Sequence, residues 1–281
     1  MQVYTERAAR GTDHGFKQVG HQIPVQHQKK PGLQEELEYP KPVSTHIPTE
    51  EGDYTSAIIT GGDSGIGRAI AILFAMEGAS SLIVYLPEEE KDAQETKRRV
   101  RGTGHDCHCL TVDVRKKESC REVVDTAMQC MGGIDILVNN AGFQNMIGDI
   151  SGLEVDQWER TFDTNIHPFF YLSKYALLHM RSGSTIINST KGAIVAFTRA
   201  LSNQQVGRGI RVNCVCPGPI WTLLIPSTMN SAAMDEFSSV PIGRPGQLSE
   251  VATCFVFLAS QDSSYISGQS LHPNGGVVVN G

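Results

Sequence analysis

The chain lacks an apolar run of the roughly 18–20 residues that a membrane-spanning helix needs. Its N-terminus also lacks the apolar core of a secretory signal. No basic stripe marks a nucleic-acid surface, because 24 Lys and Arg residues are outnumbered by 30 Asp and Glu residues, for a net charge of −6. We therefore expect a cytoplasmic protein with neither a membrane nor a nucleic acid as its partner.

The seven cysteines also lack the spacing of a zinc site. Cys107 and Cys109 are separated by a single residue, as are Cys214 and Cys216, and both pairs fall in strand-like runs. We predict no metal site and interpret the cysteines as buried thiols in a reducing compartment.

Two parts of the chain differ in composition. Residues 1–53 are rich in Gln, His, Lys, Glu and Pro and show no sustained apolar period. Such a segment buries too little apolar surface to offset its ordering entropy. We predict an extended or disordered arm over residues 1–53 and one folded domain over residues 54–281.

Within the domain, apolar runs of strand length alternate with amphipathic runs of helix length. The expected strands are 57–60, 82–86, 109–112, 134–139, 185–188, 211–215 and 270–272. The expected helices are 66–77, 88–101, 117–131, 155–180, 191–206 and 249–259. This alternation predicts an α/β fold, a single doubly wound (Rossmann-type) parallel sheet with helices on both faces.

A glycine-rich turn follows the first expected strand. It reads Gly61-Gly62-Asp63-Ser64-Gly65-Ile66-Gly67 and leads directly into a helical run. Glycines allow close backbone approach to a ligand, and a helix N-terminus offers unpaired N–H groups to an anion. The strand–turn–helix context predicts a site for the pyrophosphate of a dinucleotide.

Further motifs follow in order along the domain. They are Asp113-Val114 after the third strand, Asn139-Asn140-Ala141-Gly142, Thr164-Asn165-Ile166, Pro217-Gly218-Pro219-Ile220-Trp221-Thr222 and Asn274-Gly275-Gly276. Together with the Thr-Gly-x-x-x-Gly-x-Gly spacing from Thr60, this set resembles the short-chain dehydrogenase/reductase family. The segments 28–32 and 40–42 resemble the subgroup of glucose-and-ribitol-dehydrogenase homologues.

The resemblance implies NAD(P)-dependent oxidoreduction at a CH–OH or carbonyl group of a small molecule. It also implies cofactor contacts from Gly61, Asp63, Ser64, Gly65, Ile66, Gly67, Tyr85, Asp113, Val114, Asn140, Ala141, Gly142, Lys191, Pro217, Gly218, Ile220 and Thr222. Asn165 resembles the catalytic asparagine of the proton relay, and Lys191 resembles the catalytic lysine.

One family motif is missing. The family pairs a tyrosine with a lysine four residues later, but none of the seven tyrosines here has such a lysine, and Ile187 stands four places before Lys191. We favour a shortened form of an active enzyme and keep two alternatives. The chain is a dinucleotide-binding or scaffold protein without turnover, or Ser189 or Thr190 replaces the tyrosine, although an alcohol is a poor general acid beside a phenol.

The missing segment has expected structural consequences. The helix from Lys191 must begin almost at the end of the strand 185–188, although such connections usually take about 2–6 residues. We predict a shortened helix or a frayed strand end and a displaced Lys191. The resemblance implies a homo-oligomer, dimer or tetramer, which the shortening would weaken.

The sequence leaves the coenzyme and the substrate open. Tyr85 stands at the end of the second strand, where an acidic residue would favour NAD and an arginine would favour NADP. We lean slightly to NADP, although Glu88, Glu89 and Glu90 follow closely. Residues 223–248 fall where the family keeps a mobile lid, and the subgroup points to sugars, polyols or small carbonyl compounds.

Overall fold

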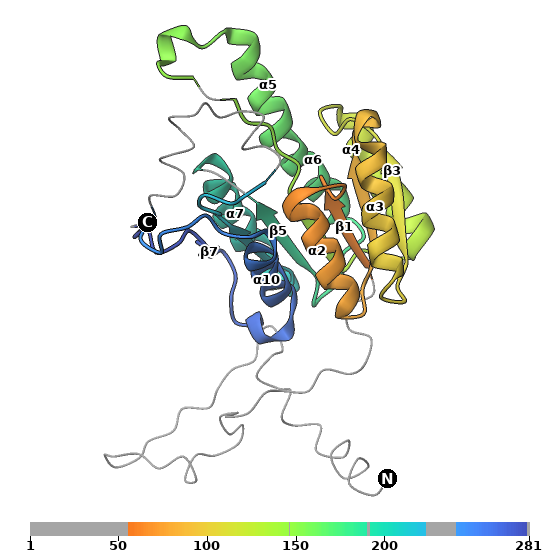
Figure 1. Cartoon of the computed structure of the whole chain (residues 1–281). Coiled ribbons are helices and arrows are strands. Elements are labelled where there is room, and N and C mark those ends of the chain that lie inside the picture. The colour runs from red at the N-terminus through yellow and green to blue at the C-terminus, as the bar shows by residue number, and fades with distance from the viewer. Residues whose placement is uncertain (1–55, 146, 190–191, 223–239, 280–281) are drawn as a thin grey trace, which may run out of the picture.

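A seven-stranded parallel sheet forms the centre of the part of the chain that the structure, a computed structural model, describes: residues 56–145, 147–189, 192–222 and 240–279 (Figure 1). The strands lie in the order β3-β2-β1-β4-β5-β6-β7. Their bounds are β1 Ser56–Thr60, β2 Ser80–Tyr85, β3 Cys107–Thr111, β4 Ile136–Asn139, β5 Thr185–Ser189, β6 Arg211–Val215 and β7 Ser270–Leu271. The predicted arm 1–53 lies outside the described residues.

Helices cover both faces of the sheet, which confirms the predicted doubly wound architecture. The helices are α2 Gly65–Met76, α3 Glu90–Arg101, α4 Lys117–Met131, α5 Val155–Asn165, α6 His167–Ala176, α7 Gly192–Gln205 and α10 Leu248–Ala259. Short 3₁₀ turns are η3 Pro87–Glu89, η4 Ile150–Gly152, η5 Val206–Arg208 and η6 Gln261–Ser263. Helices α2, α3 and α10 pack on one face, and α4, α6 and α7 pack on the other.

The strands are buried on both faces because alternate side chains enter opposite layers. In β1, Ile59 belongs to the core beneath α2, α3 and α10, whereas Ile58 belongs to the core beneath α4, α6 and α7. Both side chains are fully buried. This explains why the strand sequences read as continuous apolar runs without alternation.

The strand order reverses between β1 and β4. β1 pairs with β2 on one side and with β4 on the other, both in parallel register. Connections leaving the carboxyl ends of β1 and β4 therefore run in opposite directions, and such a switch point opens a crevice where doubly wound proteins bind ligands.

The single long helix predicted over 155–180 is wrong. It is divided at Ile166 into α5 and α6. Pro168 lies in the first turn of α6, where it has no N–H to continue the hydrogen bonds of α5. Tyr171 and Tyr175 on α6 pack against the core.

The connection between β5 and α7 consists of residues 190 and 191 alone. The predicted fraying of the strand end is wrong, because β5 continues to Ser189, which pairs with Val215 of β6. Helix α7 has 14 residues, Gly192–Gln205, and the predicted shortening of this helix stays a prediction. Thr190 and Lys191 lie outside the described residues.

A buried amide chain anchors α7 despite this short connection. Asn139 Nδ2 donates to Asn188 Oδ1 at 2.9 Å, and Asn188 Nδ2 donates to Thr198 Oγ1 at 2.9 Å. All three residues are fully buried. Hydrogen bonds between buried groups fix geometry because breaking one leaves its partner unsatisfied, so β4, β5 and α7 are held together by side chains.

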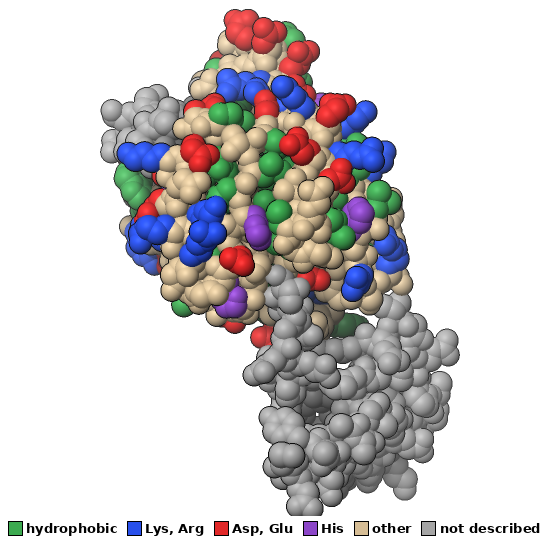
Figure 2. Space-filling view, turned by 90° about the vertical axis from the view of Figure 1, so that its right-hand side faces the viewer, with side chains coloured by type: hydrophobic (Ala, Val, Ile, Leu, Met, Phe, Trp, Pro, Cys, Tyr) green, Lys and Arg blue, Asp and Glu red, His purple; other side chains and the backbone are tan. Residues whose placement is uncertain are grey.

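The surface that faces the viewer in Figure 2 mixes basic and acidic side chains without a continuous area of one sign. Across the described residues, no helix combines the length and the apolar character needed to span a bilayer.

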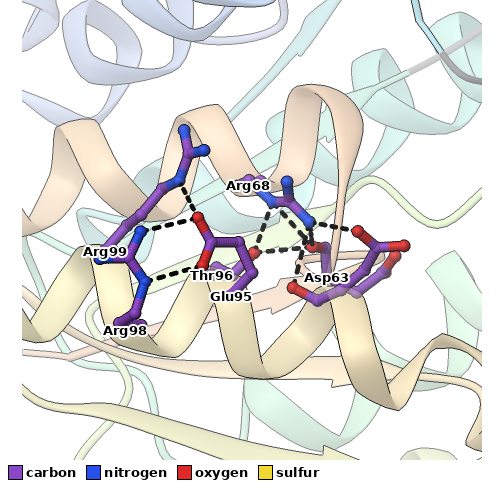
Figure 3. A network of polar contacts seen from close by, with 7 residues as sticks. Asp63, Arg68, Glu95, Thr96, Arg98 and Arg99 are labelled. Atoms are coloured by element: carbon purple, nitrogen blue, oxygen red, sulfur yellow. Dashed lines mark hydrogen bonds and ion pairs between the residues drawn. The ribbon is translucent and has the colours of Figure 1, made fainter.

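Arg68 on α2 anchors the glycine-rich turn to α3 (Figure 3). Its Nε donates to the Asp63 carbonyl at 3.0 Å and to Thr96 Oγ1 at 2.9 Å, and its Nη2 reaches the Asp92 carboxylate at 2.7 Å. Thr96 Oγ1 in turn donates to the Asp63 carbonyl at 2.7 Å. The turn is therefore held from behind by two helices before any ligand arrives.

This network predicts the cost of removing one hydroxyl. Thr96→Val keeps the side-chain shape but removes two hydrogen bonds, while Arg68 and the Asp63 carbonyl stay bonded to each other. We expect the free energy of unfolding to fall by about 1–2 kcal/mol with an unchanged m-value in urea denaturation. The matched control Thr103→Val, at an exposed turn, should stay within about 0.5 kcal/mol of the unmodified chain. Equal stabilities for the two variants would contradict the anchoring role.

Candidate functional site

A cleft of about 960 Å³ opens at the carboxyl ends of the strands, across the switch point between β1 and β4. Its walls come from the segments that follow strands β1 to β6. The structure brings together there most of the predicted site residues, namely Gly61, Asp63, Ser64, Gly65, Ile66, Tyr85, Asp113, Val114, Asn140, Ala141, Gly142, Asn165, Ser189, Pro217, Gly218, Ile220 and Thr222. Gly67 lies beneath this wall, and Thr190 and Lys191 lie outside the described residues.

The glycine-rich turn folds tightly against itself. Gly61 has φ +62° and Gly65 has φ +53°, a region that favours glycine. A Cβ atom at Gly67 would overlap the Gly61 carbonyl oxygen and would lie 2.8 Å from Asn140 Nδ2. Helix α2 therefore begins directly beneath the turn. Ser64 precedes α2 without capping it through its side chain, so the first N–H groups of the helix lack a side-chain acceptor.

The turns after β1 and β4 are bonded to each other. Thr60 Oγ1 accepts from the N–H groups of Asn140 and Ala141 at 2.9 and 3.0 Å. Asn140 Nδ2 donates back to the carbonyls of Thr60 and Gly61 at 3.1 and 3.3 Å. These bonds fix the floor of the cleft at the point where the strand order reverses.

The end of the cleft over β2 and β3 is acidic. Asp63, Glu88, Glu89 and Asp113 line it, and the Asp113 carboxylate binds Arg115 through contacts of 2.6 to 3.0 Å. This ion pair lowers the pKa of Asp113. Burial instead raises the pKa of Asp63, whose neighbour Asp92 adds repulsion.

Tyr85 lies at the end of β2, as expected, but its hydroxyl is engaged elsewhere. The ring is buried in the core, and the hydroxyl donates to Glu90 Oε2 at 2.8 Å. Burial and the bond to Glu90 help to raise the pKa of Tyr85 to about 12. Tyr85 is therefore a packing residue with one polar contact at the wall of the cleft.

The opposite end of the cleft lies over β4 to β6. Asn165, the last residue of α5, accepts from the Phe143 N–H at 2.6 Å and donates to the Phe143 carbonyl at 2.8 Å. Its amide thus fixes the loop after β4. Ser189 at the end of β5 contributes a hydroxyl, and Ile220 forms a parallel bridge with Gly246. Among the described residues of the cleft, Tyr85 is the one tyrosine.

Sequence reasoning named Glu89 only as part of an acidic run and missed other residues of the site. Glu89 and Arg115 line the cleft, and Arg68 with Thr96 supports its floor from behind. A signal existed for Glu89, whose carboxylate caps the Leu86 N–H at 2.8 Å three residues upstream, a capping-box spacing. Among the residues that the structure describes, no group of three His, Cys, Asp or Glu side chains is placed to hold a metal ion.

Comparison with known proteins identifies the family. Residues 55–190 match the family described as short chain dehydrogenase, and residues 188–278 match the family described as enoyl-(acyl carrier protein) reductase. Carrot "Glucose and ribitol dehydrogenase" is 44% identical over 288 residues, covering 93% of this chain and 99% of that protein. Arabidopsis "NADPH-dependent aldehyde reductase 1, chloroplastic" is 46% identical over 248 residues, covering 80% of this chain and 86% of that protein.

A solved structure agrees with the fold. A Burkholderia cenocepacia short chain dehydrogenase in complex with NADP superposes with a TM-score of 0.74 and 28% identity, covering 79% of this chain and 97% of that one. Two family descriptions match consecutive parts of the chain, the relatives align over most of its length, and the glycine turn lies where the strand order reverses. The chain therefore belongs to the short-chain dehydrogenase/reductase family, a family of NAD(P)-dependent oxidoreductases.

Proposed function

We propose that the cleft binds a nicotinamide dinucleotide and positions a small alcohol or carbonyl compound at its nicotinamide end. The observation that carries this proposal is the glycine turn, which places the unpaired N–H groups of α2 at the wall of a cleft of about 960 Å³. A pyrophosphate fits this turn because both the free N–H groups and the helix dipole favour an anion.

The residues present fit the two halves of such a cofactor. The backbone of Gly61, Asp63, Ser64, Gly65 and Ile66 would hold the pyrophosphate, above Gly67. Asp113 and Val114 would lie beside the adenine, Tyr85 would flank its ribose, and the turn Asn140–Gly142 would contact the other ribose. Pro217, Gly218, Ile220 and Thr222 would hold the carboxamide, and Lys191 would bind the same half.

The bound nicotinamide supplies hydride transfer. The protein must supply a proton at the substrate oxygen, which general acid–base catalysis assigns to a positioned side chain. Ser189 is the hydroxyl at the end of β5 that lines the cleft, but a serine alcohol is a poor acid. Asn165 orders the neighbouring loop through Phe143. We therefore propose Lys191 and Asn165 as residues of a relay that lacks its phenol.

The alignments support a shortened chain. The carrot alignment spans 288 residues, more than the 281 of the whole chain, although it uses 93% of this chain. The relative thus carries residues that have no counterpart here. The two family matches also meet at residues 188–190. These observations favour the loss of a segment between β5 and α7, where the proton donor would lie.

The substrate class rests on the relatives. One relative is named for glucose and ribitol and another for aldehydes. We propose sugars, polyols and small aldehydes or ketones as the compounds to assay. A homodimer or homotetramer and a cytoplasmic location stay predictions.

A second candidate function is dinucleotide binding without turnover. It is favoured by the cleft itself, whose one described tyrosine, Tyr85, lies at the adenine end with its hydroxyl bonded to Glu90. Both candidates require cofactor binding, and only the first requires hydride transfer.

The glycine turn gives a direct test of cofactor binding. Gly67→Ala places a methyl group against the Gly61 carbonyl, so the turn cannot close. We expect NADH and NADPH to bind at least ~100-fold more weakly, about 2.7 kcal/mol, in a titration followed by nicotinamide fluorescence. Gly133→Ala, where a Cβ meets only Ser56 Oγ at 3.9 Å, is the matched control and should bind normally. Unchanged binding by Gly67→Ala would refute the assigned site.

Turnover distinguishes the two candidates. Inserting a Ser…Tyr segment of the kind that the family resemblance implies, between Asn188 and Lys191, would supply a phenolic proton donor. Because such a group contributes about 10²–10⁴-fold, we expect NAD(P)H oxidation with an aldehyde panel to rise by at least about 100-fold. Inserting the same segment with phenylalanine for its tyrosine is the control. If the unmodified chain already turns over as fast as the tyrosine insertion, the missing-donor interpretation is wrong.

A further inference from the structure

The charge of the cleft distinguishes the two coenzymes, which differ by one phosphate on the adenosine ribose. We propose that Glu89 and Asp63 make this chain selective for the non-phosphorylated coenzyme, NAD(H), by excluding a 2′-phosphate and accepting hydrogen bonds from the ribose hydroxyls. This inference rests on the proposed function, because it assumes that the cleft takes a dinucleotide.

The ribose position follows from the order of the elements. The pyrophosphate site lies at the N-terminus of α2, and the adenine side lies after β3, at Asp113 and Val114. The segment between them at the edge of the cleft follows β2 and contributes Leu86, Glu88 and Glu89. Asp63 lines the same end from the glycine turn. The ribose of the adenine half would therefore meet these carboxylates.

The carboxylates of Glu89 and Asp63 can accept further hydrogen bonds, and their side chains are held in place. Glu89 is half-buried, and its Oε2 accepts from the Leu86 N–H at 2.8 Å, which fixes the side chain and leaves Oε1 as an acceptor. Asp63 is 3% exposed. Carboxylates accept hydrogen bonds and donate none when ionised, so they suit a neutral diol and repel a phosphate dianion.

The nearby basic groups do not offset this charge. Arg68, the arginine closest in sequence to the turn, is directed away into the contacts with Asp63 O, Asp92 and Thr96 (Figure 3). Arg115 is held by two oxygens of Asp113. The other basic residue among the described lining residues, Arg160, lies 4.3 Å over the Phe143 ring.

Mutual repulsion among the acids is already visible. The pKa of Glu89 is raised by burial first and then by the neighbouring charges of Asp63, Glu88 and Asp92. A site in which the existing carboxylates repel one another would be destabilised further by two more negative charges. This charge pattern reverses the slight preference for NADP that the uncharged Tyr85 had suggested.

The proposal differs from what the names of two similar proteins would suggest. The Arabidopsis relative is NADPH-dependent and the Burkholderia structure contains NADP. Transfer of the coenzyme by similarity would predict NADPH for this chain, whereas the charge of its own cleft predicts NADH.

The proposal is tested by titrating the full chain with NADH and, separately, with NADPH. Isothermal calorimetry measures the two affinities at low and at high salt. We expect NADPH to bind at least about tenfold more weakly at low salt, with a smaller ratio at high salt because salt screens the repulsion. Glu89→Gln keeps an oxygen that can cap the Leu86 N–H. Glu89→Gln and Asp63→Asn should each reduce the ratio of the NADH affinity to the NADPH affinity several-fold.

Glu90→Gln is the matched control, because Glu90 is exposed, bonds to Tyr85 and Gln94, and lies outside the cleft lining. Its ratio of affinities should not change. Equal or tighter NADPH binding, or a ratio that neither Glu89→Gln nor Asp63→Asn alters in a chain that circular dichroism shows to be folded, overturns the selectivity. Binding of neither coenzyme at millimolar concentration instead overturns the proposed function itself.

Discussion

The site depends on one steric constraint, the contact between the backbone of Gly67 and the carbonyl of Gly61. Because Gly67 has no side chain, α2 begins beneath the turn and its N–H groups reach the cleft. The Thr60–Asn140 bonds then join this turn to the turn after β4. The two halves of the sheet thus share one rigid floor, and every other lining segment is placed relative to it.

Rigidity at this floor comes from groups that never enter the cleft. Arg68 on α2 and Thr96 on α3 satisfy the Asp63 carbonyl. Arg68 is held in this supporting role and Arg115 is paired with Asp113, so neither charge is free to offset the carboxylates at the end of the cleft over β2 and β3. Under the proposed coenzyme selectivity, the support of the turn and the preference for a ligand are therefore linked, since the Arg68 side chain cannot serve both.

The sequence was sufficient for the parts of the structure that depend on local pattern. The continuous apolar runs placed all seven strands within a few residues, and the glycine spacing identified the turn, because both are set by backbone sterics and burial. The break at Ile166 was missed because the apolar period continues through Pro168. The roles of Arg68 and Thr96 were missed because they depend on contacts between separate elements. Arg68 and Thr96 are 28 positions apart, and no periodicity reports such a pairing.

The anchoring of α7 has a consequence for how this chain tolerates changes in length. Asn188 and Thr198 bond to each other on either side of the two-residue connection 190–191, so the helix is docked independently of that connection. Loop closure costs little more as a loop lengthens. The position of the helix therefore does not depend on the length of this connection alone, and the proposed proton-donor segment could be separated from the architecture that surrounds it.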